Sequence, residues 1–442
     1  MTLLVISPDY ASHLYPLATL ATAWRDAGER VVVATGPATD TLVRQFGFTR
    51  EHLQLGRGSN PGVIRAEEQP AGEDDSLRGF FEATRVGAVE TLAYQARARG
   101  DDLLWNAVGV ARAVHDVVER VRPDAIIVDH LAFGARLGLA SSGISHADVV
   151  LGHPSALTLG DEVYGYPPSW PRAFEPDPVA LEELRQLSEQ VRDEFTSQWN
   201  SALAQLNPDA TPSADAFAET GDVLLLNYPE ELHESHRTAL LPRHTFLGSA
   251  VREEAPDEQV ESWLASGDGP VVYVSLGSFL SARSDLLARI VDALRGLDVR
   301  VALANGSTPR SLLGPVPDSW LVREMLPQVT LLGHASLAVS HGGNNSVTEA
   351  LTAGVPLLLL PLSTDQFAGG AAVERRGLGE VLDPNRVDAS ELRAAAERLL
   401  GAGPDHADRT AELTRLSASL RERPGPHRAR AALSDMVVRP LD

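Results

Sequence analysis

The stretch of residues 326–366 restricts the fold of this chain more than any other. Residues 337–340 form a short apolar run, a His-Gly-Gly turn follows, and residues 345–353 carry apolar side chains at helical spacing. A glycine and a proline end that helix, and residues 357–360 form a second, continuously apolar run. Buried strand, glycine turn, helix and buried strand in this order indicate a parallel sheet covered by helices on both faces.

Polar side chains gather at the glycine turn of this stretch. His341, Asn345 and Ser346 are side-chain donors beside a helix N-terminus, where exposed N–H groups favour an anion. Glu349 lies one turn further along, and a carboxylate there suits sugar hydroxyls better than a phosphate. The pair Asp365-Gln366 follows the next strand, where open α/β sheets bind ligands. A His-Gly-Gly turn alone is more often only a turn, but the whole arrangement suits a phosphorylated ribose.

The N-terminal part of the chain begins as another unit of the same kind. Residues 3–7 and 31–35 are predicted strands on either side of a helix at residues 14–27. A dinucleotide-binding dehydrogenase would carry G-x-G-x-x-G after the first strand. The loop here reads Ser-Pro-Asp-Tyr-Ala-Ser-His, so that class is excluded. Further strands are predicted at residues 125–129, 145–151, 222–227, 271–275 and 299–304.

Length and charge narrow the class of protein. The chain has 442 residues, enough for two domains, and 43% hydrophobic residues, enough for proper cores. It contains no apolar run long enough to span a membrane and no signal-peptide pattern at its N-terminus, so a cytoplasmic location is expected. It has no cysteine, and its net charge of −22 argues against nucleic acids and anionic membranes as partners.

Five short motifs follow one another over about forty residues, within the stretch 326–366: Pro-Gln, His-Gly-Gly-x-Asn-Ser, Glu, Gly-Val-Pro and Asp-Gln. Together they resemble the donor-binding signature of the nucleotide-sugar-dependent glycosyltransferases of the GT-B fold, the relatives of plant, antibiotic-tailoring and glucuronosyl transferases. The resemblance implies an α/β fold of two Rossmann-like domains that face a central cleft. We expect an acceptor-binding domain at residues 1–246, a linker at 247–257, a donor-binding domain at 258–422, and a C-terminal helix at 423–442 that crosses back to the N-terminal domain.

The resemblance also implies a catalytic pair. Ser-His-Leu-Tyr-Pro at residues 12–16 is similar to the family's Gly-His-x-x-Pro, whose histidine is the general base, so His13 takes that role. Asp129 matches the aspartate that holds this histidine. Judged by position alone, His13 could equally cap the first helix and Asp129 the helix after its strand. His130 is a rival for either role.

The donor residues follow from the same resemblance. Gly277-Ser278 is similar to a second loop that approaches the phosphates, Gln328 meets the nucleobase edge, and Met325 stands where the family often stacks a tryptophan on the base. No Asp-x-Asp or His-Glu-x-x-His motif is present, so neither a metal nor another cofactor is expected. The expected donor-binding residues are Gly277, Ser278, Met325, Gln328, His341, Gly342, Gly343, Asn345, Ser346, Glu349, Asp365 and Gln366.

These features predict an inverting glycosyltransferase of the hexosyltransferase class that moves a sugar from a UDP- or TDP-sugar to a hydroxyl of a small molecule such as a natural product. The expected partners are the nucleotide sugar, as co-substrate, and the acceptor; the protein would be a monomer or a homodimer. Two alternatives stay open: a GT-B-like sugar-nucleotide epimerase, and a catalytically silent relative that serves as a partner protein. An aromatic segment at residues 164–174 could wall the acceptor pocket or simply pack, and a turn-rich loop at residues 55–76 is predicted to cover it.

Overall fold

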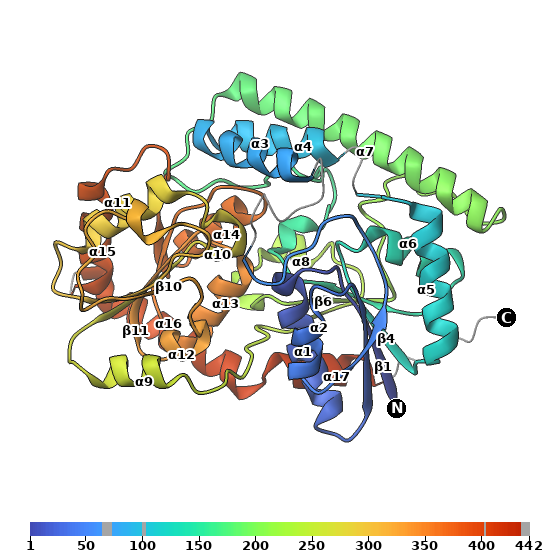
Figure 1. Ribbon diagram of the computed structural model, residues 1–442. Coiled ribbons are helices and arrows are strands. Elements are labelled where there is room, and N and C mark those ends of the chain that lie inside the picture. The colour runs from blue at the N-terminus through green and yellow to red at the C-terminus, as the bar shows by residue number, and fades with distance from the viewer. Residues whose placement is uncertain (64–72, 100–102, 402–403, 435–442) are drawn as a thin grey trace.

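The computed structural model describes residues 1–63, 73–99, 103–401 and 404–434, which form two domains side by side, each built on a parallel sheet (Figure 1). The N-terminal sheet has the strand order β3-β2-β1-β4-β5-β6-β7, and the C-terminal sheet has the order β10-β9-β8-β11-β12-β13. This confirms the predicted α/β class. Residues 64–72, the middle of the predicted covering loop at residues 55–76, lie outside the described residues.

The strands are short and mostly buried, as parallel strands covered on both faces must be. In the N-terminal sheet they are β1 Thr2–Ile6, β2 Arg30–Thr35, β3 Thr49–His52, β4 Ala125–Asp129, β5 Ala147–Val150, β6 Val223–Leu226 and β7 His244–Phe246. In the C-terminal sheet they are β8 Val271–Ser275, β9 Arg300–Ala304, β10 Leu321–Arg323, β11 Ala335–Ser340, β12 Leu357–Leu359 and β13 Gly379–Val381.

The helices connect these strands and cover both faces of each sheet. In the N-terminal domain they are α1 Ala11–Arg25, α2 Asp40–Gln45, α3 Glu73–Val86, α4 Ala88–Arg99, α5 Ala107–Val121, α6 Phe133–Ser141, α7 Pro178–Leu206 and α8 Ser235–Thr238. After it come α9 Glu258–Ala265, α10 Gly277–Leu280, α11 Ser284–Leu294, α12 Gln328–Leu332, α13 Asn344–Ala353, α14 Gln366–Arg375, α15 Ala389–Leu400, α16 Pro404–Glu422 and α17 Gly425–Ala432. No helix in these described ranges is long and apolar enough to cross a membrane.

Several helix boundaries differ from those expected. Helices α3 and α4 are separated at Gly87, because glycine is a poor helix former. The acidic run at residues 73–75, predicted as part of a loop, opens α3. The C-terminal helix expected at residues 423–442 is α17, Gly425–Ala432, and residues 435–442 lie outside the described residues.

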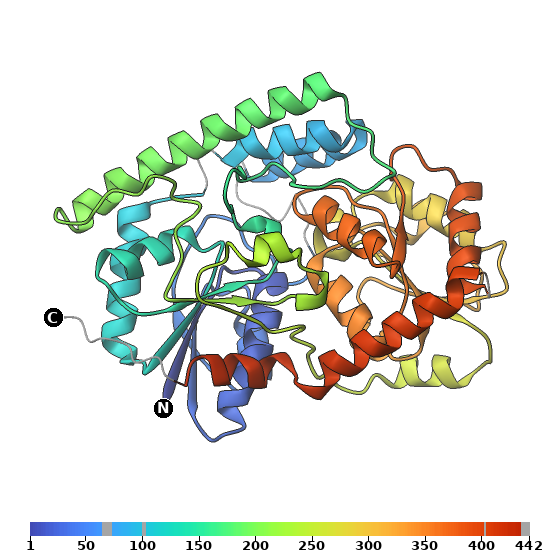
Figure 2. The ribbon, with the colours of Figure 1, turned by 180° about the vertical axis from the view of Figure 1, so that it is seen from behind.

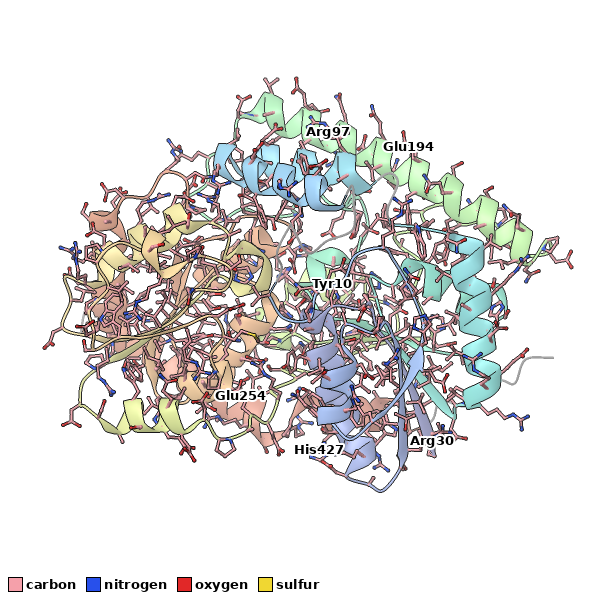
Figure 3. The ribbon with its side chains drawn as sticks, viewed as in Figure 1. Tyr10, Arg30, Arg97, Glu194, Glu254 and His427 are labelled. Atoms are coloured by element: carbon pink, nitrogen blue, oxygen red, sulfur yellow. The ribbon has the colours of Figure 1, made fainter. Side chains whose placement is uncertain are left out.

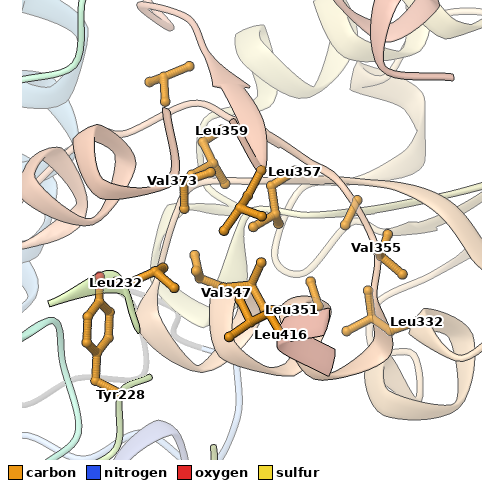
Figure 4. Packing of buried hydrophobic residues seen from close by; sticks show 14 of the residues in the cluster. Tyr228, Leu232, Leu332, Val347, Leu351, Val355, Leu357, Leu359, Val373 and Leu416 are labelled. Carbon is orange, nitrogen blue, oxygen red and sulfur yellow. The ribbon is translucent and has the colours of Figure 1, made fainter. Parts of the chain in front are cut away.

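The glycine-turn helix α13 is held between its sheet and the long helix α16. Val347 and Leu351 of α13 lie between the β12 side chains Leu357 and Leu359 and the α16 side chain Leu416 (Figure 4). All five side chains are almost fully buried. The position of the turn at the head of α13 therefore depends on this apolar core as well as on the polar groups around it.

The end of the chain returns to the N-terminal domain. Helix α16 runs along the C-terminal domain, and α17 continues across to lie beside α1 (Figure 2). Ala429 and Leu433 of this last segment are fully buried in the core of the N-terminal domain with Leu247. This confirms the predicted crossing of the C-terminal helix. Residues 247–257, the predicted linker, contain no helix or strand.

The two domains share an apolar contact as well as polar ones. Trp170 and Phe174 of the N-terminal domain lie 4.8 and 5.2 Å from the ring of Phe367 in α14, measured between centroids. At the far side of the cleft the guanidinium of Arg283 donates to the carbonyl of Thr84 in α3, 2.8 Å away. These contacts fix the spacing of the two sheets.

Replacing Leu351 with alanine should destabilise the C-terminal domain strongly. The side chain is fully buried in the core between β12 and α16, so its removal leaves a cavity and should cost about 2–5 kcal/mol. Urea unfolding followed by tryptophan fluorescence measures this loss. The control is Leu312→Ala, because Leu312 is 55% exposed and its truncation should cost little. Equal effects of the two substitutions would contradict this description of the core.

Candidate active site

A cavity of about 550 Å³ lies between the two domains, at the carboxyl ends of the strands of both sheets. Parallel sheets bind ligands at this edge, because the loops that follow the strands converge there. His13 and His341 line the cavity from the N-terminal and the C-terminal domain, respectively. Tyr10, which precedes α1, marks the centre of the molecule between the two halves (Figure 3). The sequence predicted this placement of the two histidines.

His13 and Asp129 form a direct pair at the wall of this cavity. Nδ1 of His13 lies 2.6 Å from Oδ2 of Asp129, and the other carboxylate oxygen accepts a hydrogen bond from the backbone N–H of Leu131 at 2.9 Å. The two residues meet because β1 and β4 are adjacent in the sheet, so the loops after them are neighbours. The carboxylate is buried, whereas the imidazole is 29% exposed.

This pair sets the protonation of the imidazole. A carboxylate accepts from Nδ1–H, which leaves Nε2 as the basic atom of the neutral ring. Burial lowers the pKa of His13, but the charge and hydrogen bond of Asp129, with a smaller contribution from Asp365, raise it more, so the net shift is upward. His13 is thus a stronger base than an isolated histidine.

His130, the rival from sequence, belongs to a different cluster. Its Nδ1 lies 3.3 Å from Oδ2 of Asp148 in β5, and the guanidinium of Arg136 donates to the same oxygen at 2.9 Å. All three side chains are buried. Burial and Arg136 lower the pKa of His130 in spite of Asp148. No local pattern marks this cluster in the sequence, because Asp148 lies within an otherwise apolar strand.

The glycines of the two donor loops make room for one ring. A Cβ atom on Gly277 would lie 2.6 Å from Cε1 of His341, and one on Gly343 would lie 2.5 Å from its Nε2. Gly277 also has a φ of 72°, which glycine adopts without strain. Gly342 completes the turn, and Ser278 continues the short helix α10, although its side chain is not among those described. Burial lowers the pKa of His341 to about 4, so its ring is neutral near pH 7.

The first turn of α13 touches both domains. The side-chain amide of Asn345 donates to the carbonyl of Ser12 at 3.0 Å, directly before His13. Ser346 donates from Oγ to Oε1 of Gln328 at 3.3 Å. The first N–H groups of any helix lack acceptors within that helix. The N-terminus of α13 thus lies at the cavity, beside the loop that carries His13. Its unpaired N–H groups suit an anion there.

Glu349 is buried behind the cavity wall, with 5% of its surface exposed. Nη1 of Arg252 donates to its Oε1 at 2.8 Å, and Nε2 of Gln328 donates to its Oε2 at 2.5 Å. Arg252 comes from the segment between the domains and lines the cavity. Sequence analysis missed it, because that segment is polar and without regular structure.

The last pair expected in the donor site is Asp365-Gln366. The carboxylate of Asp365 accepts the backbone N–H of His153, so it joins the loop before α14 to the N-terminal domain. Oε1 of Gln366 accepts the N–H groups of Leu362 and Ser363 at 3.0 and 3.2 Å. Both residues line the cavity, but their oxygens also have structural roles that the sequence did not reveal.

Met325 lines the mouth of the cavity and is 51% exposed. It lies against Gly62, where an added Cβ would be 3.4 Å from its terminal methyl group. The aromatic segment at residues 164–174 divides: Tyr164 and Tyr166 line the cavity, whereas its tryptophan and phenylalanine pack on α14. Within the described residues, no three histidine or acidic side chains are grouped so that they could hold a metal ion.

Comparison with known proteins shows that this chain is similar to glycosyltransferases. The demethyllactenocin mycarosyltransferase of Streptomyces fradiae is 28% identical over 63% of this chain and 57% of its own length. The chain spans about half the length of several relatives that it matches. The 4'-demethylrebeccamycin synthase of Lentzea aerocolonigenes is 25% identical over 90% of this chain and 91% of its own length.

Structural similarity extends over both domains. The glycosyltransferase VinC, solved in complex with DTDP, superposes with a TM-score of 0.65 at 19% identity and covers 98% of each chain. Together with the two facing parallel sheets, this confirms the GT-B fold. The profile described as UDP-glucoronosyl and UDP-glucosyl transferase matches residues 185–424, more than half of the chain. The chain belongs to the family of UDP-glucoronosyl and UDP-glucosyl transferases.

Proposed function

We propose that this protein is an inverting glycosyltransferase that moves a sugar from a nucleoside-diphosphate sugar to a hydroxyl of a small molecule. The observation that carries the proposal is the His13–Asp129 pair, which faces the N-terminus of α13 across one cavity. A base on one side and an anion site on the other are what such a transfer needs. The donor is a UDP- or TDP-sugar; VinC was solved with DTDP.

His13 acts on the acceptor in this scheme. The acceptor oxygen forms a bond to the anomeric carbon while the bond from that carbon to the diphosphate oxygen breaks. Nε2 of His13 takes the hydroxyl proton, and Asp129 stabilises the imidazolium, as the acid does in a serine-hydrolase triad. The nucleoside diphosphate leaves with the electron pair of the broken bond. Attack from the side opposite the leaving group inverts the anomeric configuration.

The donor is held by the C-terminal domain without a metal ion in our proposal. The N-terminus of α13, with Asn345 and Ser346, binds the diphosphate beside His341 and the glycine loops. Gln328 and Glu349 bind the nucleoside, and Asp365 with Gln366 binds the sugar hydroxyls. These roles rest on the family resemblance and, for all of these side chains except the buried Glu349, on their placement around the cavity.

The acceptor occupies the N-terminal side of the cavity. Its wall there is largely apolar and includes Leu131, Val150, Tyr164 and Tyr166. Such a wall suits a small molecule with an apolar body, and the relatives named for demethyllactenocin and demethylrebeccamycin point the same way. We therefore propose a natural product as the acceptor. An epimerase would not need this wall, and the relatives named above give that alternative no support.

Replacing His13 with alanine should abolish most of the transfer and leave donor binding intact. Loss of a positioned base costs about 10²–10⁴-fold in rate. Asp129→Asn should lose part of the activity, because the ring is then less well oriented. Transfer to a panel of phenol and alcohol acceptors measures both effects. The control is His236→Ala, since the His236 side chain is 74% exposed and pairs with Glu234 at the surface. Wild-type transfer by His13→Ala would refute the proposed base.

The activity should fall as the pH is lowered through the pKa of His13. His13 must be neutral to act as a base. Burial lowers its pKa, but Asp129 and Asp365 raise it more, so the fall in activity on the acidic side of the pH profile should lie above about pH 6.5. Asp129→Asn removes the main group that raises the pKa, so its fall in activity should move to lower pH. A profile of kcat/KM against pH for both proteins measures the shift. If the acidic side of the profile has the same midpoint in both proteins, Asp129 does not set the pKa of the group that titrates.

Replacing Ser346 with alanine should weaken nucleotide-sugar binding about tenfold or more, because a hydrogen bond to a charged phosphate is worth roughly 1.5–3 kcal/mol. Isothermal titration calorimetry with UDP-glucose and TDP-glucose measures it. The control is Ser419→Ala, a helix serine of α16 that bonds Glu231 outside the cavity. Repeating the titrations and the transfer assay in EDTA should change nothing, as the proposed mechanism uses no metal. If Ser346→Ala binds both nucleotide sugars as tightly as the wild type, Ser346 does not bind the diphosphate.

A further inference from the structure

Arg252 lies in the segment between the domains and contacts parts of the molecule that the two domains supply separately. Its Nη1 donates to Oε1 of Glu349 in α13, and its Nη2 donates to Oε1 of Glu254, both at 2.8 Å. Its guanidinium carbon also lies 5.0 Å from the ring centre of Tyr15 in α1. Glu254, labelled in Figure 3, marks this segment. The Arg252 side chain is 19% exposed and lines the cavity.

Arg252 offsets the cost of burying Glu349. Burial raises the pKa of Glu349, Arg252 and the hydrogen bond from Gln328 lower it, and Glu254 raises it, with a net shift upward. Tyr273 of β8 also faces this group, since its hydroxyl donates to Oε1 of Gln328 at 3.2 Å. A buried carboxylate that loses its cation tends to take up a proton. The charge of Glu349 therefore depends on Arg252.

The pairing leaves Glu349 able to bind a further group. Each carboxylate oxygen can accept about two hydrogen bonds. Oε1 accepts one from Arg252 and Oε2 accepts one from Gln328, so each oxygen retains one acceptor site. Arg252 and Gln328 also line the cavity and flank the carboxylate on either side. The carboxylate itself lies behind the cavity wall, so a ribose hydroxyl would reach these acceptor sites between Arg252 and Gln328, without displacing the arginine.

Arg252 also contacts α1, the helix that carries His13, because its guanidinium stacks on Tyr15. Tyr15 lies two residues after His13 in α1 and itself lines the cavity. A guanidinium over an aromatic face is attracted to it, more strongly when the pair is partly desolvated. One side chain thus touches both the carboxylate expected to bind the ribose and the helix that carries the proposed base.

We propose that Arg252 is a positioning residue of the donor site, which holds Glu349 ionised and aimed at the ribose hydroxyls and ties it to α1 through Tyr15. The inference rests on the proposed function, because it takes Glu349 as the ribose-binding group. Arg252 adds little attraction for the diphosphate, because its charge is offset by the carboxylates of Glu349 and Glu254.

The test is the affinity for UDP-glucose and TDP-glucose, measured by calorimetry from about pH 8 to about pH 5. The phosphates of a nucleotide sugar do not titrate in that range, so the protein alone causes any pH dependence. Arg252→Met should weaken binding about tenfold near pH 7. The loss should grow as the pH falls, because Glu349 then takes up a proton. Arg252→Lys keeps the charge and should restore most of the pH independence.

Two further variants separate this inference from a folding defect. Arg323→Met is the matched control, since Arg323 pairs with Asp257 at 2.7 Å outside the cavity and its loss should leave affinity unchanged. Arg252→Met/Glu349→Gln removes both charges, so it should recover thermal stability but not affinity. Recovery of affinity in the double variant would reduce Arg252 to a purely structural ion pair and overturn the inference.

The outcomes also distinguish the inference from the proposed function. If Glu349→Gln weakens nucleotide-sugar binding while Arg252→Met leaves it unchanged at every pH, only the role of Arg252 is wrong. Tighter binding by Arg252→Met would show that the ion pair blocks the carboxylate, which is the reverse of our inference. If Glu349→Gln and Arg252→Met both leave affinity unchanged, the ribose assignment itself fails. If neither nucleotide sugar binds the wild-type protein, the proposed donor class fails with it.

Discussion

The site depends on one geometric constraint: the carboxyl ends of the strands in one parallel sheet face the carboxyl ends of the strands in the other. Every strand pair in both sheets is parallel, so every loop that follows a strand in one domain points toward the loops of the other. His13 and Asp129 follow β1 and β4, and the glycine turn of His341 follows β11. A base from one sheet and a helix N-terminus from the other therefore meet without any long excursion of the chain.

The facing edges are held together by amides as well as by apolar side chains. Asn344, at the start of α13, donates to the carbonyls of Leu151 and Asn227 in the N-terminal domain, both at 2.8 Å. The Asn227 side chain in turn donates to Oδ1 of Asn345 at 3.3 Å and accepts the N–H of Ala250. These bonds set the N-terminus of α13 against the loop of His13. In our proposal, the same few residues that bind the diphosphate also fix the distance to the base.

The parts of the fold that the sequence predicted are those with a strong local pattern. The strands β4 and β8 were predicted to the residue, because each is a buried run that ends at a polar or small residue. The edge strand β10 has only three residues, one of them buried, so it carries no such pattern. Helix α16 was missed because its apolar residues are few and its contacts with α13 are distant in sequence.

The same contrast holds at the site. His13, Asp129 and the glycine turn could be predicted, because they lie at strand ends and in a recognisable motif. Arg252 and its partner Glu349 are 97 positions apart, and nothing local marks either as a member of a pair. Asp148 and Arg136 are likewise hidden, since one lies in an apolar strand and the other in an apolar helix. Long-range ion pairs arise only after the chain has folded.

The negative net charge of the chain opposes the binding of an anionic donor, and the local structure of the site offsets this effect. The chain carries a net charge of −22, yet the proposed donor is a dianion. Among the described residues that line the cavity, Arg252 is the only arginine, and it is shared between two carboxylates. The attraction for a diphosphate must then come from uncharged groups: the N-terminus of α13, the glycine loops and the side chains of Asn345 and Ser346. Helix N-termini and backbone amides act over a few ångströms, where the distant acidic surface is screened by solvent and salt. An acidic protein can therefore bind an anionic donor, provided that the phosphates lie directly on that helix end.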